Sequence, residues 1–256
     1  MLPVGGPSLD DDKRRELGAA FLSGGEHYDA VRPGYPADSV TWLTEGLVRR
    51  GAALDVGAGT GKFTARLLEQ GWDVTALDPS ADMLAQLHAN HPDVQVIVGA
   101  TESIELPDGC MDLATVAQAW HWCDPLRAST ELARVLRPGG TLGLVWNQLD
   151  VTVPWVHRLA RIMHAGDVHN PGFRPAVGPE FTGLVNHETH WAQPVTPEDL
   201  LELVKSRSYY LHAPDAIRAK VLGNLGWYLF EHLGHAPGES LDLPYFTSTW
   251  RARSVR

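Results

Sequence analysis

Cysteine is scarce in this chain, with only Cys110 and Cys123 among 256 residues, and the two do not form a C-x-x-C pair. This disfavours a disulfide scaffold or a thiolate zinc site and makes a reducing compartment the default expectation. No apolar run reaches 18 residues, so we expect no membrane-spanning helix. The first residues contain no basic stretch followed by an apolar one, so we expect no signal peptide and a cytoplasmic protein.

Positive charge is also in deficit, with 21 Lys and Arg against 31 Asp and Glu and a net charge of −10. An acidic chain repels the phosphate backbone of nucleic acids, so no nucleic-acid partner is expected. The chain is 44% hydrophobic, which is enough for one sizeable core with an added cap. We expect a small-molecule partner, and a monomer or a homodimer.

No metal site is predicted. His187 and His190 are three residues apart, as in some metal-binding pairs. They fall in a segment that alternates like a strand, where residues at odd spacing point to opposite faces. The pair is therefore not expected to hold an ion.

Strand and helix patterns alternate from residue 52 to residue 146. Five strands joined by helical crossovers imply a parallel sheet covered on both faces. The strands are expected at 52–56, 73–77, 94–98, 111–117 and 141–146, and the helices at 60–70, 81–90, 101–104 and 125–136.

The regular alternation of strand and helix patterns ends after residue 147, and two further strands and three helices are expected there. The fold class is therefore α/β, with a doubly wound, mostly parallel, seven-stranded Rossmann-like sheet and a small helical cap. We divide the chain into an N-terminal tail with a helix (1–26), a cofactor-binding core (27–147), and the remaining strands with a helical cap for the substrate (148–256). The late strands are expected at 187–195 and 245–251, and the late helices at 155–165, 197–206 and 214–233.

Alternating glycines directly follow the first predicted strand, where residues 54–61 read LDVGAGTG. In a doubly wound sheet, ligands bind beyond the carboxyl ends of the strands. The spacing differs from G-x-G-x-x-G, which places a pyrophosphate on a helix N-terminus. Asp55 would repel a pyrophosphate and suits a ligand with an amino group. Asp78 ends the next strand, where an acid that binds ribose is expected, so the pattern indicates a nucleoside-bearing cofactor.

Five stretches of the chain resemble the class I S-adenosylmethionine-dependent methyltransferases, in particular their small-molecule branch with a type 11 domain. The stretches are LDVGAGTG (54–61), LDPSADML (77–84), GATESIELP (99–107), AQAWHW (117–122) and RVLRPGG (134–140). The opening segment HYDAVRPGYP (27–36) is similar to that of trans-aconitate-type methyltransferases. The resemblance implies S-adenosylmethionine as cofactor, S-adenosylhomocysteine as product, and transfer of a methyl group to an O, N or C atom of a small organic molecule. A carboxylate and a secondary metabolite are both candidate acceptors.

The resemblance also implies which residues bind the methionine part of the cofactor. The glycine turn, with Gly57, Ala58 and Gly59, would pack against it, and Asp55 would face its amino group. Gln118 would lie near its carboxylate and the sulfonium. Two residues of the opening segment would close over that carboxylate, a bidentate role suited to arginine: Tyr28 and Arg32. For Arg32, an ion pair with Asp29 or Glu26 is the alternative.

The nucleoside part would lie over the second and third strands. Asp78 would hold both ribose hydroxyls, and Pro79 and Met83 would lie along the adenine. Plain helix packing is the alternative for Met83. The adenine edge would be gripped by Ala100, Thr101 and Glu102.

His121 is the candidate catalytic base, because it follows the fourth strand and is expected to face the cleft. A base helps only if the acceptor carries a proton. The alternative is that His121 packs under the cap, with Asp124 capping the next helix. The residues expected to line the substrate pocket are His27, Tyr35, Trp120, Trp122 and Trp146.

The cap offers further aromatic and basic residues. Tyr209, Tyr210 and Trp227 are candidates for lining the cap, but we favour helix packing for each, because an apolar stripe at helical spacing accompanies them. A carboxylate acceptor would need cationic residues there, and the available ones are Arg158, Arg161, Arg174, Arg207 and Arg218. Two other functions stay open: a cyclase-like or regulatory protein that binds S-adenosylmethionine without methyl transfer, and an NAD-dependent oxidoreductase, which the glycine spacing disfavours.

Overall fold

The computed structural model describes residues 32–47, 51–164 and 172–255. The helix expected before residue 24 and the predicted site residues His27 and Tyr28 lie outside these residues. Seven strands form a single sheet in the order β3-β2-β1-β4-β5-β7-β6. The strands are β1 (Ala52–Val56), β2 (Asp73–Asp78), β3 (Gln95–Val98), β4 (Met111–Ala117), β5 (Leu136–Leu149), β6 (Phe181–Val195) and β7 (Leu241–Ser254).

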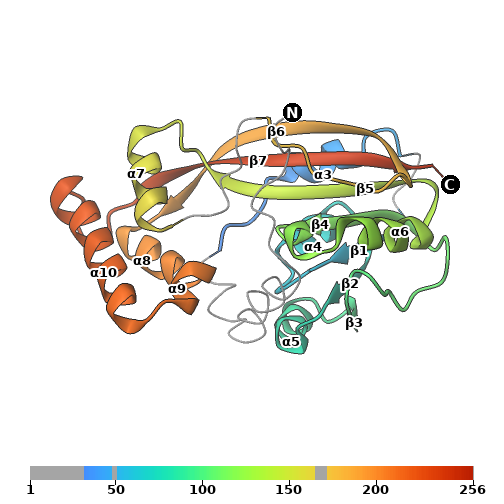
Figure 1. Cartoon of the computed structure of the whole chain (residues 1–256), viewed down its shortest axis with the longest axis horizontal. Helices are drawn as coiled ribbons and strands as arrows, with labels where there is room; N and C mark the ends of the chain where they lie inside the picture. Colours follow the sequence, from blue (N-terminus) through green and yellow to red (C-terminus); the bar gives the residue numbers. More distant parts are fainter. Residues whose placement is uncertain (1–31, 48–50, 165–171, 256) are drawn as a thin grey trace.

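The first five strands run parallel, and β7 lies antiparallel between β5 and β6. Strand order reverses at β1, with β2 and β3 on one side and β4 on the other, which makes the sheet doubly wound (Figure 1). The predicted fold class is therefore confirmed. Such a reversal leaves a crevice beyond the carboxyl ends of β1 and β4, where ligands bind in this architecture.

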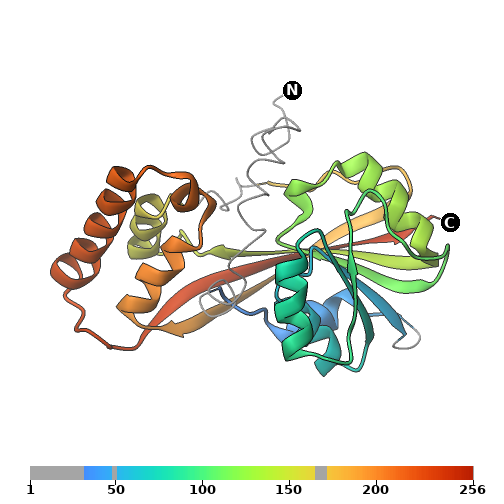
Figure 2. The same cartoon turned by 90° about the horizontal axis from the view of Figure 1, so that it is seen from below.

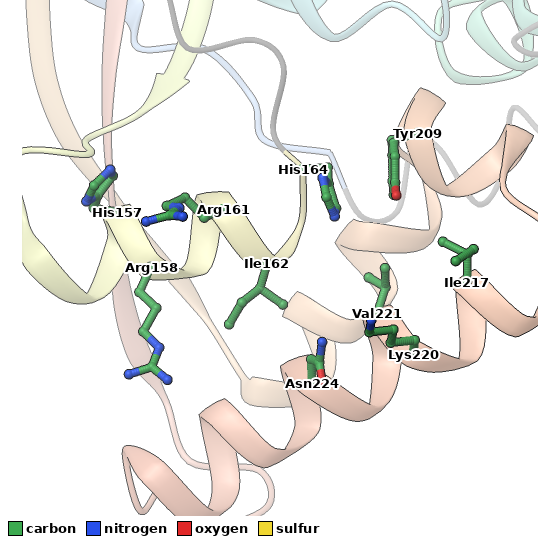
Figure 3. A pocket seen from close by; sticks show the side chains of 10 residues that line it. All are labelled: His157, Arg158, Arg161, Ile162, His164, Tyr209, Ile217, Lys220, Val221 and Asn224. Atoms are coloured by element: carbon green, nitrogen blue, oxygen red, sulfur yellow. The ribbon is translucent and has the colours of Figure 1, made fainter.

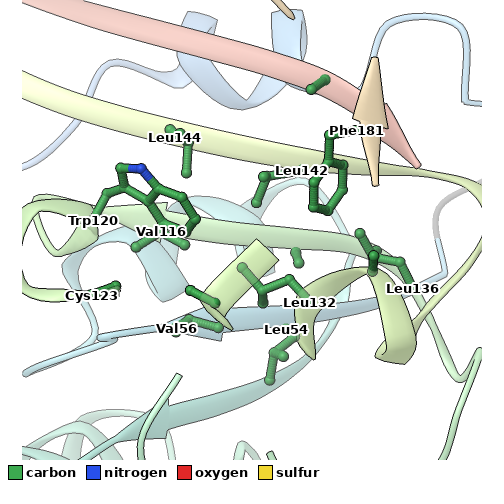
Figure 4. Close-up of a cluster of buried hydrophobic side chains, with 14 of the residues drawn as sticks. Leu54, Val56, Val116, Trp120, Cys123, Leu132, Leu136, Leu142, Leu144 and Phe181 are labelled. Atoms are coloured by element: carbon green, nitrogen blue, oxygen red, sulfur yellow. The ribbon is translucent and has the colours of Figure 1, made fainter. Parts of the chain in front are cut away.

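Helices cover both faces of this part of the sheet, because residues alternate between the two faces along each strand. Ala53 and Leu113 pack with the helices on one face, whereas Leu54 and Ala114 pack with α6 on the other. Figure 4 shows the α6 side of this core, where Leu132 lies among strand residues. The helices are α3 (Ala37–Leu43), α4 (Lys62–Glu69), α5 (Ala81–Asn90), the 3-10 turn η1 (Trp120–Trp122) and α6 (Pro125–Val135).

Side-chain caps set the start of two of these helices. Ser80 Oγ accepts a hydrogen bond from Met83 N at the start of α5, and Asp124 Oδ1 accepts from Leu126 N and Arg127 N at the start of α6. Such caps satisfy amide groups that have no partner within the helix. The helix expected at 101–104 was wrong, because Ala100 and Ser103 pair there as an isolated bridge.

The last three strands are longer than predicted and carry a cap of helices beyond the rest of the sheet (Figures 1 and 2). The Pro-Gly-Gly segment (138–140), which precedes the strand expected at 141–146, belongs to β5, and β5 begins at Leu136 opposite Met111. The cap has its own core, in which Leu159, Leu203 and Leu225 are buried. Its helices are α7 (Pro154–Ile162), α8 (Pro197–Lys205), α9 (Ser208–His212), α10 (Asp215–Gly226) and the π-helical turn η2 (Trp227–His232).

Membrane-spanning and metal-binding features were searched for in the described ranges. No described helix combines the length and hydropathy needed to cross a bilayer. The same residues contain no group of three or more His, Cys, Asp or Glu that could hold a metal ion. His187 and His190 lie in β6 and contact different acids, Asp38 at 2.7 Å and Asp150 at 3.7 Å.

A fully buried carboxyl group, that of Asp55, lies in the middle of the sheet. Its Oδ2 accepts a hydrogen bond from Thr64 Oγ1 at 2.7 Å, and its Oδ1 accepts from Thr115 Oγ1 at 2.9 Å. Burial raises the pKa of Asp55 from 3.8 to about 6, an increase that the two hydroxyl groups only partly offset.

We predict that Asp55 makes stability fall as the pH rises from about 4 to about 6. In that window the folded chain keeps a proton that the unfolded chain has already released. The free energy of unfolding, measured in urea, should decrease for the native chain relative to Asp55→Asn by on the order of 2 kcal/mol between about pH 4 and about pH 7. A difference that stays constant, or that grows with pH, would contradict the raised pKa.

Candidate active site

A narrow cavity of about 70 Å³ lies in the crevice beyond the carboxyl ends of β1 and β4. Its walls come from the glycine turn after β1, the segment before α3, the ends of β4, β5 and β7, and the cap. Small-molecule sites usually measure about 300–1,000 Å³, so this cavity is smaller than a site for a whole nucleoside ligand. The lining residues outside the glycine turn are Arg32, Pro33, Tyr35, Asp55, Lys62, Phe63, Ala117, Gln118, Asn147, Leu203, Arg207 and Tyr245.

The glycine turn brings bare backbone to this cavity. Gly57 has a φ of +64°, and a Cβ there would lie 2.4 Å from the Cβ of Ala119. Gly59 has a φ of +55°, and a Cβ there would meet nothing within 4 Å. Gly57 is thus required by close packing and Gly59 by its backbone conformation, which only glycine adopts at low cost. The predicted turn lies against the cavity as expected from the sequence.

Asp78 ties the glycine turn to the end of β2. Its Oδ2 accepts a hydrogen bond from Gly59 N at 2.9 Å, and its Oδ1 accepts from Ser80 N at 2.8 Å. Burial raises the pKa of Asp78, and these two amide donors oppose the shift. Each carboxylate oxygen has a second lone pair, so Asp78 can still accept hydrogen bonds from ligand hydroxyls.

The positions predicted for the adenine lie at the ends of β2 and β3, outside the lining of the cavity. Met83 is buried in α5, whereas Pro79 is exposed. Thr101 Oγ1 accepts a hydrogen bond from Cys123 Sγ at 3.3 Å, and Glu102 Oε1 accepts from Asp124 N at 2.8 Å. The loop after β3, which includes Ala100, is thereby joined to the loop after β4.

Gln118 has a backbone conformation that is rare for residues other than glycine, with a φ of +57°. Its amide N donates to Val145 O at 2.8 Å, and its side-chain Nε2 donates to Asn147 O, also at 2.8 Å. Such strain persists only where the surroundings impose it, and it is typical of ligand sites. The sequence pointed to Gln118 through its place in a motif, whereas its strain became visible only in the structure.

Arg32 links the segment before α3 to the cap. Its Nε donates to Ser206 Oγ at 3.0 Å, and its Nη2 donates to Ser206 O at 2.8 Å. The alternative acids, Glu26 and Asp29, lie outside the described residues. Arg32 therefore joins two parts of the cavity wall that are 174 residues apart in the chain.

The predicted pocket aromatics are only partly brought together. Tyr35 lines the cavity and packs edge-on against Phe63, with the ring centroids 5.1 Å apart. Trp120 and Trp146 are instead buried in the core on the α6 face, where Trp120 Nε1 donates to Ala176 O at 3.0 Å (Figure 4). Alternation along β5 turns Trp146 away from the face that carries Val145.

His121 and Trp122 lie in η1, with ring centroids 4.5 Å apart. His121 is exposed, and neither side chain is part of the cavity lining as the described residues define it. The role of His121 as a base stays a prediction. Asp124 caps α6, as the alternative interpretation expected.

Several lining residues come from the cap side of the sheet and were not predicted, except that Arg207 was one of five basic residues considered for a carboxylate acceptor. Leu203 and Arg207 belong to the end of α8 and the residues after it, and Tyr245 to β7. Asn147 is buried, donates from Nδ2 to Gly34 O at 2.7 Å and accepts from Thr247 Oγ1 at 2.7 Å. The one feature of the sequence that indicated a role for Asn147 in the site was its position directly after the fifth predicted strand (141–146).

Comparison with known proteins agrees with this geometry. A family model described as a methyltransferase domain matches residues 54–144. An uncharacterized methyltransferase of Mycobacterium tuberculosis (strain ATCC 25618 / H37Rv) is 43% identical over 240 residues, which span 93% of this chain and 97% of the relative.

Two solved structures share the fold. A structure from Anaeromyxobacter dehalogenans, assigned to the type II methyltransferases, is 28% identical and has a TM-score of 0.62 over 88% of this chain and 97% of that one. A phosphoethanolamine N-methyltransferase of Haemonchus contortus, in complex with phosphomonomethylethanolamine and S-adenosylhomocysteine, is 14% identical and has a TM-score of 0.52 over 97% of this chain and 61% of that one. This chain belongs to the class I S-adenosylmethionine-dependent methyltransferases and is an enzyme of methyl transfer.

Proposed function

We propose that the methyl acceptor is a small organic carboxylate, held between the glycine turn and the cap. The observation that carries this proposal is the composition of the cavity wall, to which both parts contribute. Leu203 and Tyr245 supply apolar surface on the cap side, and Arg207 supplies a positive charge there. A cation beside the acceptor favours a carboxylate and disfavours a cationic amine.

The cofactor half of the cavity is assigned as follows. Gly57 and Gly59 hold the methionine part, with the negative charge of Asp55 beneath its amino group. Arg32 and Gln118 bind its carboxylate. Tyr28, which lies outside the described residues, and Ala58 complete this half. The nucleoside is assigned to Asp78, Pro79, Met83, Ala100, Thr101 and Glu102.

The reaction is an in-line displacement at the methyl carbon. A nucleophilic atom of the acceptor forms a bond to that carbon while the carbon–sulfur bond breaks. The electron pair of that bond goes to sulfur and leaves S-adenosylhomocysteine. The cofactor supplies the electrophile, so the protein mainly has to align the acceptor and exclude water. Both tasks suit a cavity that lies between two parts of the chain and closes over its ligands.

A carboxylate oxygen needs no base, whereas an acceptor that carries a proton on its nucleophile does. His121 is our candidate for that role. It lies three residues after Gln118, at the carboxyl end of β4.

We also infer a cytoplasmic location. Cys110 and Cys123 are both free thiols, which fits a reducing compartment.

The acceptor class can be tested by first separating a metabolite extract into anionic, neutral and cationic fractions on an anion-exchange column. Each fraction is then incubated with the enzyme and methyl-labelled S-adenosylmethionine. We expect label to move into a compound of the anionic fraction. Arg207→Gln should lower kcat/KM for that compound by about tenfold or more, because a charged hydrogen bond is lost. Label in the neutral or cationic fraction would contradict the proposed acceptor class.

Asp78→Asn should weaken the binding of S-adenosylhomocysteine by about tenfold to a hundredfold, since hydrogen bonds from ribose to a charged group are worth about 1.5–3 kcal/mol. Calorimetry measures the affinity, and thermal unfolding shows whether the variant remains folded. Asp82→Asn, at an exposed position in the first turn of α5, is the matched control and should bind as the native chain does. Equal affinity of Asp78→Asn and the control would remove the ribose assignment.

For an acceptor that carries a proton on its nucleophilic atom, His121→Gln should lower kcat near neutral pH by about a hundredfold or more while leaving the affinity for S-adenosylhomocysteine unchanged. The rate of the variant should recover at higher pH, where the acceptor loses its proton without help. His88→Gln, on the exposed side of α5, is the control. A kcat equal to that of the control would leave His121 without a catalytic role.

A further inference from the structure

A second and larger hollow, which we call the α7–α10 groove, lies within the cap (Figure 3). Its volume of about 630 Å³ falls in the range of small-molecule sites, about 300–1,000 Å³. It shares no described residue with the cavity over the glycine turn. The groove is lined by His157, Arg158, Arg161, Ile162, His164, Tyr209, Ile217, Lys220, Val221 and Asn224.

The lining is positively charged in a chain whose net charge is −10. Arg158, Arg161 and Lys220 supply three fixed cations, and no Asp or Glu is among the described residues of the lining. None of the three forms an ion pair with a described carboxylate, whereas arginines elsewhere do, such as Arg134 with Glu131 at 2.7 Å. Cations gathered without carboxylate partners produce a local positive potential that attracts anions.

On one side of the groove, two aromatic rings restrict the position of the Arg158 guanidinium. The guanidinium carbon of Arg158 lies 5.5 Å from the centroid of the Trp227 ring and 5.1 Å from that of the Tyr228 ring. Contacts of this kind attract a cation to the ring face and restrict its motion. Trp227 is 45% exposed, so the prediction that it is packed inside the cap was wrong.

Another part of the lining comes from His164, which has a φ of +47°. Its ring stacks on that of Tyr209, with the centroids 3.9 Å apart (Figure 3). Tyr209 is 42% exposed, so its assignment to helix packing was also wrong. His164 directly follows the C-cap of α7, where a left-handed residue commonly ends a helix, so this end of the groove is set by the end of α7.

The groove also has an apolar part. Ile162, Val221 and Ile217 lie between the charged residues, and Ile217 is partly open to solvent at 36% exposure. An inorganic ion would leave this surface in contact with water. A ligand that carries its charges on an apolar or planar body would cover it.

We propose that the α7–α10 groove binds a small organic polyanion, with at least two phosphate or carboxylate groups on an apolar or planar body. The cations match such groups in sign and in hydrogen-bonding capacity, since arginine binds phosphates and carboxylates with paired donors. A long nucleic acid is disfavoured, because the chain outside the groove carries the excess of negative charge.

Calorimetry with the full chain tests the site, with saturating S-adenosylhomocysteine present to fill the other cavity. The probes are ADP for organic phosphates, citrate for polycarboxylates, and adenosine as the uncharged counterpart of ADP. We expect ADP or citrate to bind with a Kd on the order of 1 mM or lower, and more weakly as salt rises. Adenosine should bind far more weakly. Which anion binds distinguishes phosphate from carboxylate recognition.

Variants locate the binding. The double variant Arg161→Gln, Lys220→Gln should have an affinity for the anion that is at least tenfold lower than that of the native chain. Lys220→Glu as a single substitution should also weaken anion binding at least tenfold. It lies at an exposed position of α10, where a change leaves the core intact. Arg127→Gln, on the exposed side of α6, is the control and should bind normally. Absence of binding by both anions, or equal binding by the groove variants and the control, would overturn the proposal, independently of any methyl transfer.

Discussion

The hydrogen bond from Gly59 N to Asp78 Oδ2, 2.9 Å long, is the interaction on which the active site depends. It fixes the left-handed turn after β1 against the end of β2, so that bare backbone and a buried carboxylate face the same crevice. Asp55 lies in the strand just before this turn and is buried with two threonine hydroxyls. Two acids held so close to bare backbone suit a ligand that has both an amino group and ribose hydroxyls.

The long strands β5 and β7 connect this crevice to the cap. Both run on past the sheet of parallel strands, as β6 does. β5 leads into α7, β6 leads into α8, and α10 is followed by η2 and β7 (Figure 2). The contact of Arg32 with Ser206 then joins the segment before α3 to the cap across the crevice. The cavity of about 70 Å³ therefore has walls from both the cap and that segment.

Local patterns predicted the sheet and the cofactor turn well, because both depend on near neighbours in the chain. The bounds of β1, α5 and β4 agree with those predicted from apolar alternation and helical spacing. The acceptor side was predicted poorly. Tyr245 reaches the cavity through the antiparallel pairing of β7 with β5, and Arg207 through the position of α8, and no motif marks either. Trp146 was misplaced, because the sequence does not say which face of a strand buried on both sides meets the ligand.

A crystal structure with S-adenosylhomocysteine would test the central claim most directly. We predict that the ribose hydroxyls lie within hydrogen-bonding distance of Asp78, and that the sulfur faces the space lined by Gln118, Arg207 and Tyr245. Arg32 should then contact the ligand carboxylate. A ligand whose ribose lies away from Asp78, or whose nucleoside occupies the α7–α10 groove, would contradict the account.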